Sequence, residues 1–116
     1  MPPKSLSEVV LVLAILAPIG EEVVFRGIVE SYLLLQRIGF WISIAMPGIL
    51  FSLIHITPFS SAPKKVLVTI LFTALIVGLL AGYYRAVSGS LLPAIVIHSL
   101  FNITGFTVGR IISRQP

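Results

Sequence analysis

The sequence contains no cysteine and no aspartate, and only 10% of its 116 residues are charged. Without cysteine, the chain can form no disulfide, no thiol nucleophile and no cysteine metal site. Without aspartate, it cannot carry a catalytic pair of aspartates. The carboxylates and imidazoles available for acid–base chemistry are those of its four glutamates and two histidines.

Apolar residues take the place of the missing charges. Hydrophobic residues make up 57% of the chain and the mean hydropathy is +1.09, whereas soluble proteins are about 45–50% apolar and about 25% charged. Residues 38–63, 66–84 and 86–109 carry no charged residue, and each run is near or above the roughly 20 residues that cross a bilayer as a helix. Residues 9–36 are long enough too, but they carry charges. The sequence predicts one domain, residues 1–116, folded as an all-α polytopic transmembrane helical bundle of about four segments.

We interpret the net charge of +4 as membrane topology rather than as a surface for nucleic acid. If the segments alternate across the membrane, one side carries Lys4, Lys64, Lys65, Arg110 and Arg114. The other side carries Arg37 and Arg85. The side richer in Lys and Arg is expected to face the cytoplasm. This pattern indicates an integral, multi-pass membrane protein in contact with lipid, with no nucleic-acid partner.

The adjacent Glu21 and Glu22 are unusual in so apolar a chain. Charge at membrane depth costs at least about 2.5 kcal/mol per group, which makes such residues candidates for function. Neighbours on a helix point about 100° apart, so we expect the two carboxylates to differ in role. Glu22 shares a helix face with Arg26 and is predicted to form a buried ion pair with it, which leaves Glu21 as the reactive carboxylate. In the alternative, both glutamates only neutralise Arg26.

Two further pairs have the same spacing of four residues: Phe51 with His55, and His98 with Asn102. With Glu21, the two histidines and Asn102 are nearly all the strongly polar groups at membrane depth, so we predict that they line one polar cavity. A carboxylate and an imidazole can deprotonate water, and an imidazole with a carboxamide can donate hydrogen bonds to an oxyanion. This is the minimal set for cleaving an amide without a covalent intermediate or a cofactor.

Three alternatives remain open from the residues alone. Neither histidine belongs to a His-Glu-x-x-His zinc motif, but Glu21, His55 and His98 could bind zinc and leave a fourth position for water. A serine nucleophile is conceivable at Ser52 or Ser99, although a packed hydroxyl is expected there. Finally, the polar residues could only pack, in a non-catalytic membrane scaffold or immunity protein.

The order and spacing of these motifs resemble the CAAX protease and bacteriocin-processing family, also called the Abi family. The resemblance extends from about Leu13 to Gly105 and rests on Glu21-Glu22-x-x-x-Arg26, Phe51-x-x-x-His55 and His98-x-x-x-Asn102. It implies an integral membrane glutamate endopeptidase whose active site opens toward the cytosol. In the eukaryotic branch a prenylated protein loses its last three residues, whereas many prokaryotic members act in bacteriocin maturation, self-immunity or signalling. A peptide or a lipidated protein is the implied substrate.

The resemblance also implies roles for individual residues. Glu21 and His55 would activate the attacking water. His98 and Asn102 would form the oxyanion hole. The residues that would support these four are Glu22, Arg26 and Phe51.

Three expectations concern the bundle itself. A break or strong kink near Pro18-Gly20 would bring Glu21 to the depth of the histidines. Family members commonly have membrane helices before and after this core, and a polar cavity facing lipid is costly, so we expect a homo-oligomer or a partner subunit. Two pairs of glycines have a spacing that allows close helix contact: Gly78 with Gly82, and Gly105 with Gly109.

Overall fold

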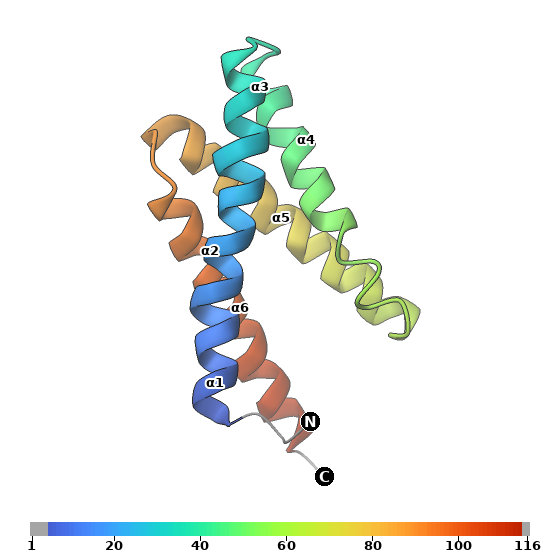
Figure 1. Cartoon of the computed structure of the whole chain (residues 1–116). Helices are drawn as coiled ribbons and strands as arrows, with labels where there is room; N and C mark the ends of the chain where they lie inside the picture. Colours follow the sequence, from blue (N-terminus) through green and yellow to red (C-terminus); the bar gives the residue numbers. More distant parts are fainter. Residues whose placement is uncertain (1–4, 115–116) are drawn as a thin grey trace.

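The computed structural model describes residues 5–114, which form four helical rods and no strand (Figure 1). The first rod consists of five consecutive segments: α1 (Leu6–Leu11), η1 (Val12–Leu16), α2 (Ala17–Glu22), η2 (Val23–Glu30) and α3 (Ser31–Leu35). The other rods are α4 (Phe40–Leu53), α5 (Lys64–Ser88) and α6 (Leu92–Ser113). The predicted all-α fold is confirmed for the described residues.

The first rod begins at a capping box. The Ser5 side chain accepts a hydrogen bond from the backbone N–H of Glu8, and the Glu8 carboxylate accepts one from the backbone N–H of Ser5. This reciprocal pair is what the pattern Ser-x-x-Glu favours at a helix start. At its other end the rod stops after Leu35, where Arg37 (φ 53°) and Gly39 (φ 132°) turn the chain toward α4.

The rod runs without interruption through Pro18 and Gly20, so the expected break is absent. In an α-helix, proline lacks an N–H and its ring collides with the carbonyl four residues earlier. Here the π-helical segment η1 precedes Pro18, and the N–H of Ala17 bonds to the carbonyl of Val12, five residues back. The wider π turn accommodates the proline within a continuous helix. A bend of the helix axis at this point stays a prediction.

The charge-free run at residues 38–63 forms a shorter helix than the sequence predicts. Helix α4 ends at Leu53, and residues 54–62 follow as turns that lead to α5. At 1.5 Å per residue, the helix is about 21 Å long. Proline and small polar residues favour turns in this connection; they are Thr57, Pro58, Ser60, Ser61 and Pro63.

Helices α5 and α6 are each long and apolar enough to cross a membrane. They are joined through Gly89, whose left-handed conformation (φ 69°) ends α5, as is common for glycine at helix ends. Large apolar side chains face outward on several rods; Trp41 is 68% exposed and Phe72 is 62% exposed. Such a surface suits lipid rather than water. Four membrane crossings stay a prediction, because α4 is shorter than the other two helices.

Gly78 and Gly82 bring α5 close to both the first rod and α4. A Cβ added to Gly78 would lie 3.0 Å from the backbone of Gly48 and 3.2 Å from Nη2 of Arg26. A Cβ added to Gly82 would lie 2.9 Å from Oε1 of Glu30. These two glycines therefore do more than allow close helix packing, because they make room for charged side chains of the first rod.

Gly78→Ala is expected to lower the free energy of unfolding by about 1–3 kcal/mol, the usual cost of overpacking. The better helix propensity of alanine offsets at most about 1 kcal/mol of this. Gly109→Ala is the matched control, because nothing lies within 4 Å of its added methyl group. Thermal unfolding in detergent measures both variants. Equal midpoints for the two variants would contradict the close contact at Gly78.

Candidate active site

Glu22 and Arg26 form the buried ion pair that their spacing predicts. Both side chains are 0% exposed, and Nη1 of Arg26 donates a hydrogen bond of 3.1 Å to Oε1 of Glu22. Nη2 of Arg26 donates a second hydrogen bond, of 2.6 Å, to the carbonyl of Gly78 on α5. A buried charge pair needs such additional hydrogen bonds to offset its loss of hydration. Arg26 thereby fixes the position of Glu22 and joins the first rod to α5.

His98 of α6 lies between the two glutamates. Its Nδ1 is 2.9 Å from Oε1 of Glu22, and its Nε2 is 3.5 Å from Oε2 of Glu21. An ionised carboxylate only accepts hydrogen bonds, so Nδ1 of His98 is the donor in the contact with Glu22. The contact orients the imidazole in the way that the aspartate of a catalytic triad orients its histidine. It leaves Nε2 directed toward Glu21.

The buried ring of Phe51 contacts both histidines. Its centroid lies 5.0 Å from the ring of His55 and 5.1 Å from the ring of His98, with edge-to-face geometry in both cases. The guanidinium carbon of Arg26 lies 5.0 Å from the same centroid, within the range of a cation–π interaction. Phe51 is 2% exposed, so its buried ring packs against both imidazoles and the guanidinium of Arg26 at once.

His55 follows the end of α4 and hydrogen-bonds to its own chain. Its Nδ1 lies 2.8 Å from the carbonyl of Phe51. A carbonyl only accepts, so Nδ1 carries the hydrogen and Nε2 of the neutral ring is left with a lone pair. Among the described residues, the imidazole in contact with Glu21 is that of His98 and not that of His55.

Asn102 joins α6 to η1. Its Nδ2 donates a hydrogen bond of 2.8 Å to the carbonyl of Leu13. The helix offers that carbonyl no partner, because the N–H of Ala17 bonds to Val12 and Pro18 has no N–H. A carboxamide nitrogen carries two hydrogens, so one donor of Asn102 remains for another partner.

Glu21, His55, His98 and Asn102 line one cavity of about 560 Å³. The rest of the lining is mostly apolar and comes from all four rods; it includes Leu13, Phe51, Ile70, Val77 and Phe101. The volume lies within the range of small-molecule and peptide-sized sites. The structure therefore brings together all four residues that the sequence singled out.

The two adjacent glutamates have different surroundings. The Glu21 side chain is 33% exposed and borders the cavity, whereas the Glu22 side chain is 0% exposed and lies behind His98. A carboxylate that reacts with a diffusing substrate has to be accessible, and a carboxylate that only orients a neighbour does not. This difference agrees with separate roles for Glu21 and Glu22.

Sequence reasoning missed a second buried carboxylate, that of Glu30, which is 0% exposed like Glu22. The adjacent Ser31 donates its hydroxyl to the carbonyl of Arg26 (2.8 Å) and accepts a hydrogen bond from Arg85 (3.0 Å). Arg85 had been assigned only to topology. The spacing of four that joins Glu22 to Arg26 continues to Glu30, and this is the signal that could have identified it.

The structure also shows where the residues of the serine and zinc alternatives lie. Ser52 donates its hydroxyl to a backbone carbonyl of α5 at 2.7 Å, which is the packing role expected for it, and neither Ser52 nor Ser99 lines the cavity. Among residues 5–114, no three side chains of His, Asp or Glu are grouped so that they could hold a metal ion. Glu21, His55 and His98 thus share a cavity without forming a zinc-binding group in this arrangement.

The fold and the cavity define a helical bundle with an apolar outer surface and a polar interior site. The family model described as type II CAAX prenyl endopeptidase Rce1-like matches residues 3–104. Because the match covers most of the chain, the protein belongs to this membrane-embedded family of CAAX-type peptidases, and the resemblance seen in the motifs is confirmed. No curated protein and no solved structure matches the chain. The roles of the individual site residues stay predictions.

Proposed function

We propose that the protein is an intramembrane endopeptidase that hydrolyses a peptide bond near the membrane surface with water activated by glutamate and histidine. The observation that carries this proposal is the shared cavity of Glu21, His55, His98 and Asn102. Polar groups at membrane depth are costly and mark functional sites. Four of them converging from the first rod, the turn after α4 and α6 therefore favour catalysis over packing alone.

In the proposed mechanism Glu21 is the general base, and His55 orients the water in the cavity. Glu21 takes a proton from the water as the water oxygen attacks the carbonyl carbon of the substrate. In this mechanism His98 is an imidazolium, which carries a hydrogen on both ring nitrogens. The oxyanion formed accepts hydrogen bonds from Nε2–H of His98 and from the free N–H of Asn102. When the C–N bond breaks, Glu21 returns its proton to the leaving amine.

Glu22 and Arg26 act on this chemistry through His98. The Nδ1–H of His98 is held by Glu22, and Glu22 is held by Arg26. His98 can then present Nε2–H to the oxyanion without first reorienting, which is the advantage of a preorganised donor. We therefore regard Glu22 and Arg26 as positioning residues that need not touch the substrate.

We propose that the active site faces the cytosol. Figure 1 shows the start of α1, the end of α6 and the connection between α4 and α5 toward one end of the molecule, in the lower half of the view. The described basic residues at that end are Lys64, Lys65, Arg110 and Arg114; Lys4 lies outside the described residues. The positive-inside rule assigns this end to the cytoplasm, and His55 lies near it, after the end of α4.

The proposed substrate is a peptide or lipidated protein that loses its C-terminal residues, as in CAAX processing, and bacteriocin-type peptide processing is the alternative. The test uses the purified protein in liposomes and a farnesylated peptide with a free C-terminus. Release of the last three residues, detected by mass spectrometry, would support the proposal. An unprenylated copy of the peptide shows whether the lipid is required. If the folded protein cleaves neither peptide nor a bacteriocin precursor, the proposal fails.

Asn102 offers a way to separate stability from catalysis. Asn102→Ala is expected to cost about 1–3 kcal/mol of stability, because the carbonyl of Leu13 loses its partner, and to lower kcat by about 10²- to 10³-fold, because an oxyanion donor is lost. Adding Pro18→Ala supplies a backbone N–H for the freed carbonyls. The double variant should regain its unfolding midpoint but not its kcat. Recovery of both would contradict an oxyanion role for Asn102.

Hydrolysis by this mechanism needs no metal. We expect the cleavage rate to be unchanged after treatment with a strong chelator and removal of the chelated metal. A zinc peptidase treated in parallel is the positive control, since it has to lose activity. Loss of activity here, reversed by added zinc, would select the zinc-dependent alternative.

Membrane lipid is the proposed partner of the apolar outer surface. A second copy of the chain or a partner subunit would shield the polar cavity from acyl chains, whose contact with unpaired polar groups is costly. Cross-linking in native membranes, followed by mass spectrometry, distinguishes a homo-oligomer from a complex with another protein. A monomer at all cross-linker concentrations would contradict both.

A further inference from the structure

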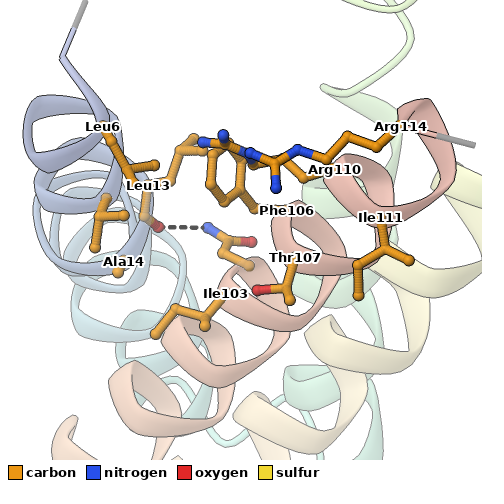
Figure 2. Close-up of a pocket in the computed structure, with 11 residues that line it drawn as sticks. Leu6, Leu13, Ala14, Ile103, Phe106, Thr107, Arg110, Ile111 and Arg114 are labelled. Atoms are coloured by element: carbon orange, nitrogen blue, oxygen red, sulfur yellow. Dashed lines mark hydrogen bonds between the residues drawn. The ribbon is translucent and has the colours of Figure 1, made fainter.

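A second groove, of about 450 Å³, runs between the first rod and α6 (Figure 2). Its walls are mainly apolar and include Leu6, Val10 and Ile103. Three residues line both this groove and the active-site cavity: Leu13, Asn102 and Phe106. The groove is therefore adjacent to the cavity at Asn102, the proposed oxyanion donor.

Arg110 and Arg114 lie at the part of the groove farther along α6 from Asn102. Figure 2 shows both side chains reaching across the groove beside Phe106. The guanidinium carbon of Arg110 lies 5.7 Å from the centroid of the Phe106 ring, a cation–π contact that limits its movement. Within residues 5–114, neither arginine forms an ion pair with an acidic side chain. This part of the groove thus carries positive charge that the described chain does not neutralise.

We propose that this groove binds the residues on the C-terminal side of the cleaved bond, and that Arg110 and Arg114 bind the free carboxylate at the end of the substrate. The inference rests on the proposed endopeptidase function and adds a rule of substrate recognition to it. The substrate class is a peptide with an unblocked C-terminus a few residues beyond the cleavage site.

The length of the groove supports this substrate class. Arg110 follows Asn102 by eight residues on α6, which corresponds to about 12 Å along the helix axis. Helical side chains lean toward the N-terminus of their helix, and the contact of Arg110 with Phe106 agrees with this. The guanidinium of Arg110 therefore lies nearer to Asn102 than the spacing along the helix axis alone would give. Three extended residues span about 10 Å. A peptide cut beside Asn102 can therefore reach Arg110 with its third residue.

The chemistry of the groove also favours a peptide terminus over a lipid headgroup. Arginine binds a carboxylate through two parallel hydrogen bonds, and the apolar walls between Asn102 and Arg110 suit the apolar side chains of a short peptide. A lipid phosphate could bind the same arginines. Binding of a lipid headgroup, however, does not explain why the groove lies next to the active-site cavity. The adjacency at Leu13, Asn102 and Phe106 is expected if one chain occupies both spaces.

The experiment measures binding without turnover. Glu21→Gln protein in nanodiscs of neutral lipid is titrated with two fluorescent peptides that differ only in a free or an amidated C-terminus. The free acid should bind about 10- to 100-fold more tightly, the loss typical of removing a hydrogen bond to a charged group. Arg110→Gln combined with Arg114→Gln should abolish that preference. Arg37→Gln, an exposed arginine before α4, is the matched control and should preserve it.

Each other outcome overturns the inference. Equal binding of acid and amide, binding of neither, or a preference that survives the loss of both arginines would each contradict recognition of the carboxylate. An effect of the two arginines that requires anionic lipid would assign the groove to a lipid headgroup instead. Because binding is read without cleavage, a protein that prefers the acid through its arginines but cleaves no peptide would refute the proposed function and leave the carboxylate site standing.

Discussion

Glu21→Gln is expected to lower kcat by about 10²- to 10⁴-fold, the usual contribution of a general base, without loss of the folded state. Glutamine has nearly the same shape as glutamate but cannot accept the proton of the attacking water. The fold is not expected to depend on this carboxylate, because Glu21 is 33% exposed and its contact with His98, at 3.5 Å, is long for a hydrogen bond. The measurement is kcat for a fluorogenic peptide in liposomes, with the thermal unfolding midpoint recorded on the same samples.

Glu8→Gln is the matched control for this variant. Glu8 is exposed and belongs to the capping box of α1, where glutamine can replace glutamate. The same chemical change should therefore leave both kcat and the midpoint close to those of the wild type. A Glu21→Gln protein that keeps its kcat would show that the polar cavity is a packing feature, as in the scaffold alternative.

Arg26→Met is expected to lower the free energy of unfolding by about 3–5 kcal/mol, the usual cost of removing one partner of a buried ion pair. Three interactions disappear together: the hydrogen bond to Glu22, the hydrogen bond to Gly78 and the stacking over Phe51. The larger part of the cost comes from Glu22, whose carboxylate stays buried without its cation. Thermal unfolding in detergent, or the rate of limited proteolysis, measures the loss.

A double variant tests that explanation. Adding Glu22→Gln to Arg26→Met removes the uncompensated charge, so the pair should be less destabilised than the sum of the two single variants. Arg37→Met is the control for losing an arginine, because Arg37 is exposed, and it should have little effect. Additive losses from Glu22→Gln and Arg26→Met would contradict a direct ion pair.

The sequence was sufficient to predict which polar residues line one cavity. Helical spacing determines which side chains share a face, so the pairing of Glu22 with Arg26 and the common face of Phe51 and His55 follow from a four-residue interval. Few strongly polar groups lie at membrane depth, so one cavity was the simplest arrangement in an apolar bundle for Glu21, His55, His98 and Asn102. The structure agrees with each of these inferences.

The contacts between rods could not be predicted in the same way. Periodicity does not specify which helices meet, so it could not place His98 between Glu21 and Glu22 or place Gly78 against Gly48. These contacts depend on tertiary packing, in which a small residue on one helix has to face a large or charged residue on another.

The role of Pro18 also could not be predicted from the sequence. A proline in a helical segment normally indicates a break or a kink, and a break or strong kink was expected here. Instead a π turn keeps the helix continuous and leaves the carbonyl of Leu13 without a helical partner, which the side chain of Asn102 then supplies. One backbone irregularity in η1 thus positions a residue of the proposed oxyanion hole, and π turns leave no clear signal in a single sequence.

Cysteine labelling shows directly whether the four polar residues share a water-filled space inside the membrane. The chain has no cysteine, so Glu21→Cys, His55→Cys, His98→Cys and Asn102→Cys each introduce a single thiol. A membrane-impermeant maleimide should label Glu21→Cys, His55→Cys and Asn102→Cys, and His98→Cys more slowly because that position is buried. The reagent should act only from the cytosolic face. Phe72→Cys, on the apolar outer surface, should stay unlabelled. Labelling of Phe72→Cys as fast as the cavity positions, or none at Glu21→Cys and Asn102→Cys in folded protein, would contradict a common aqueous site for peptide hydrolysis.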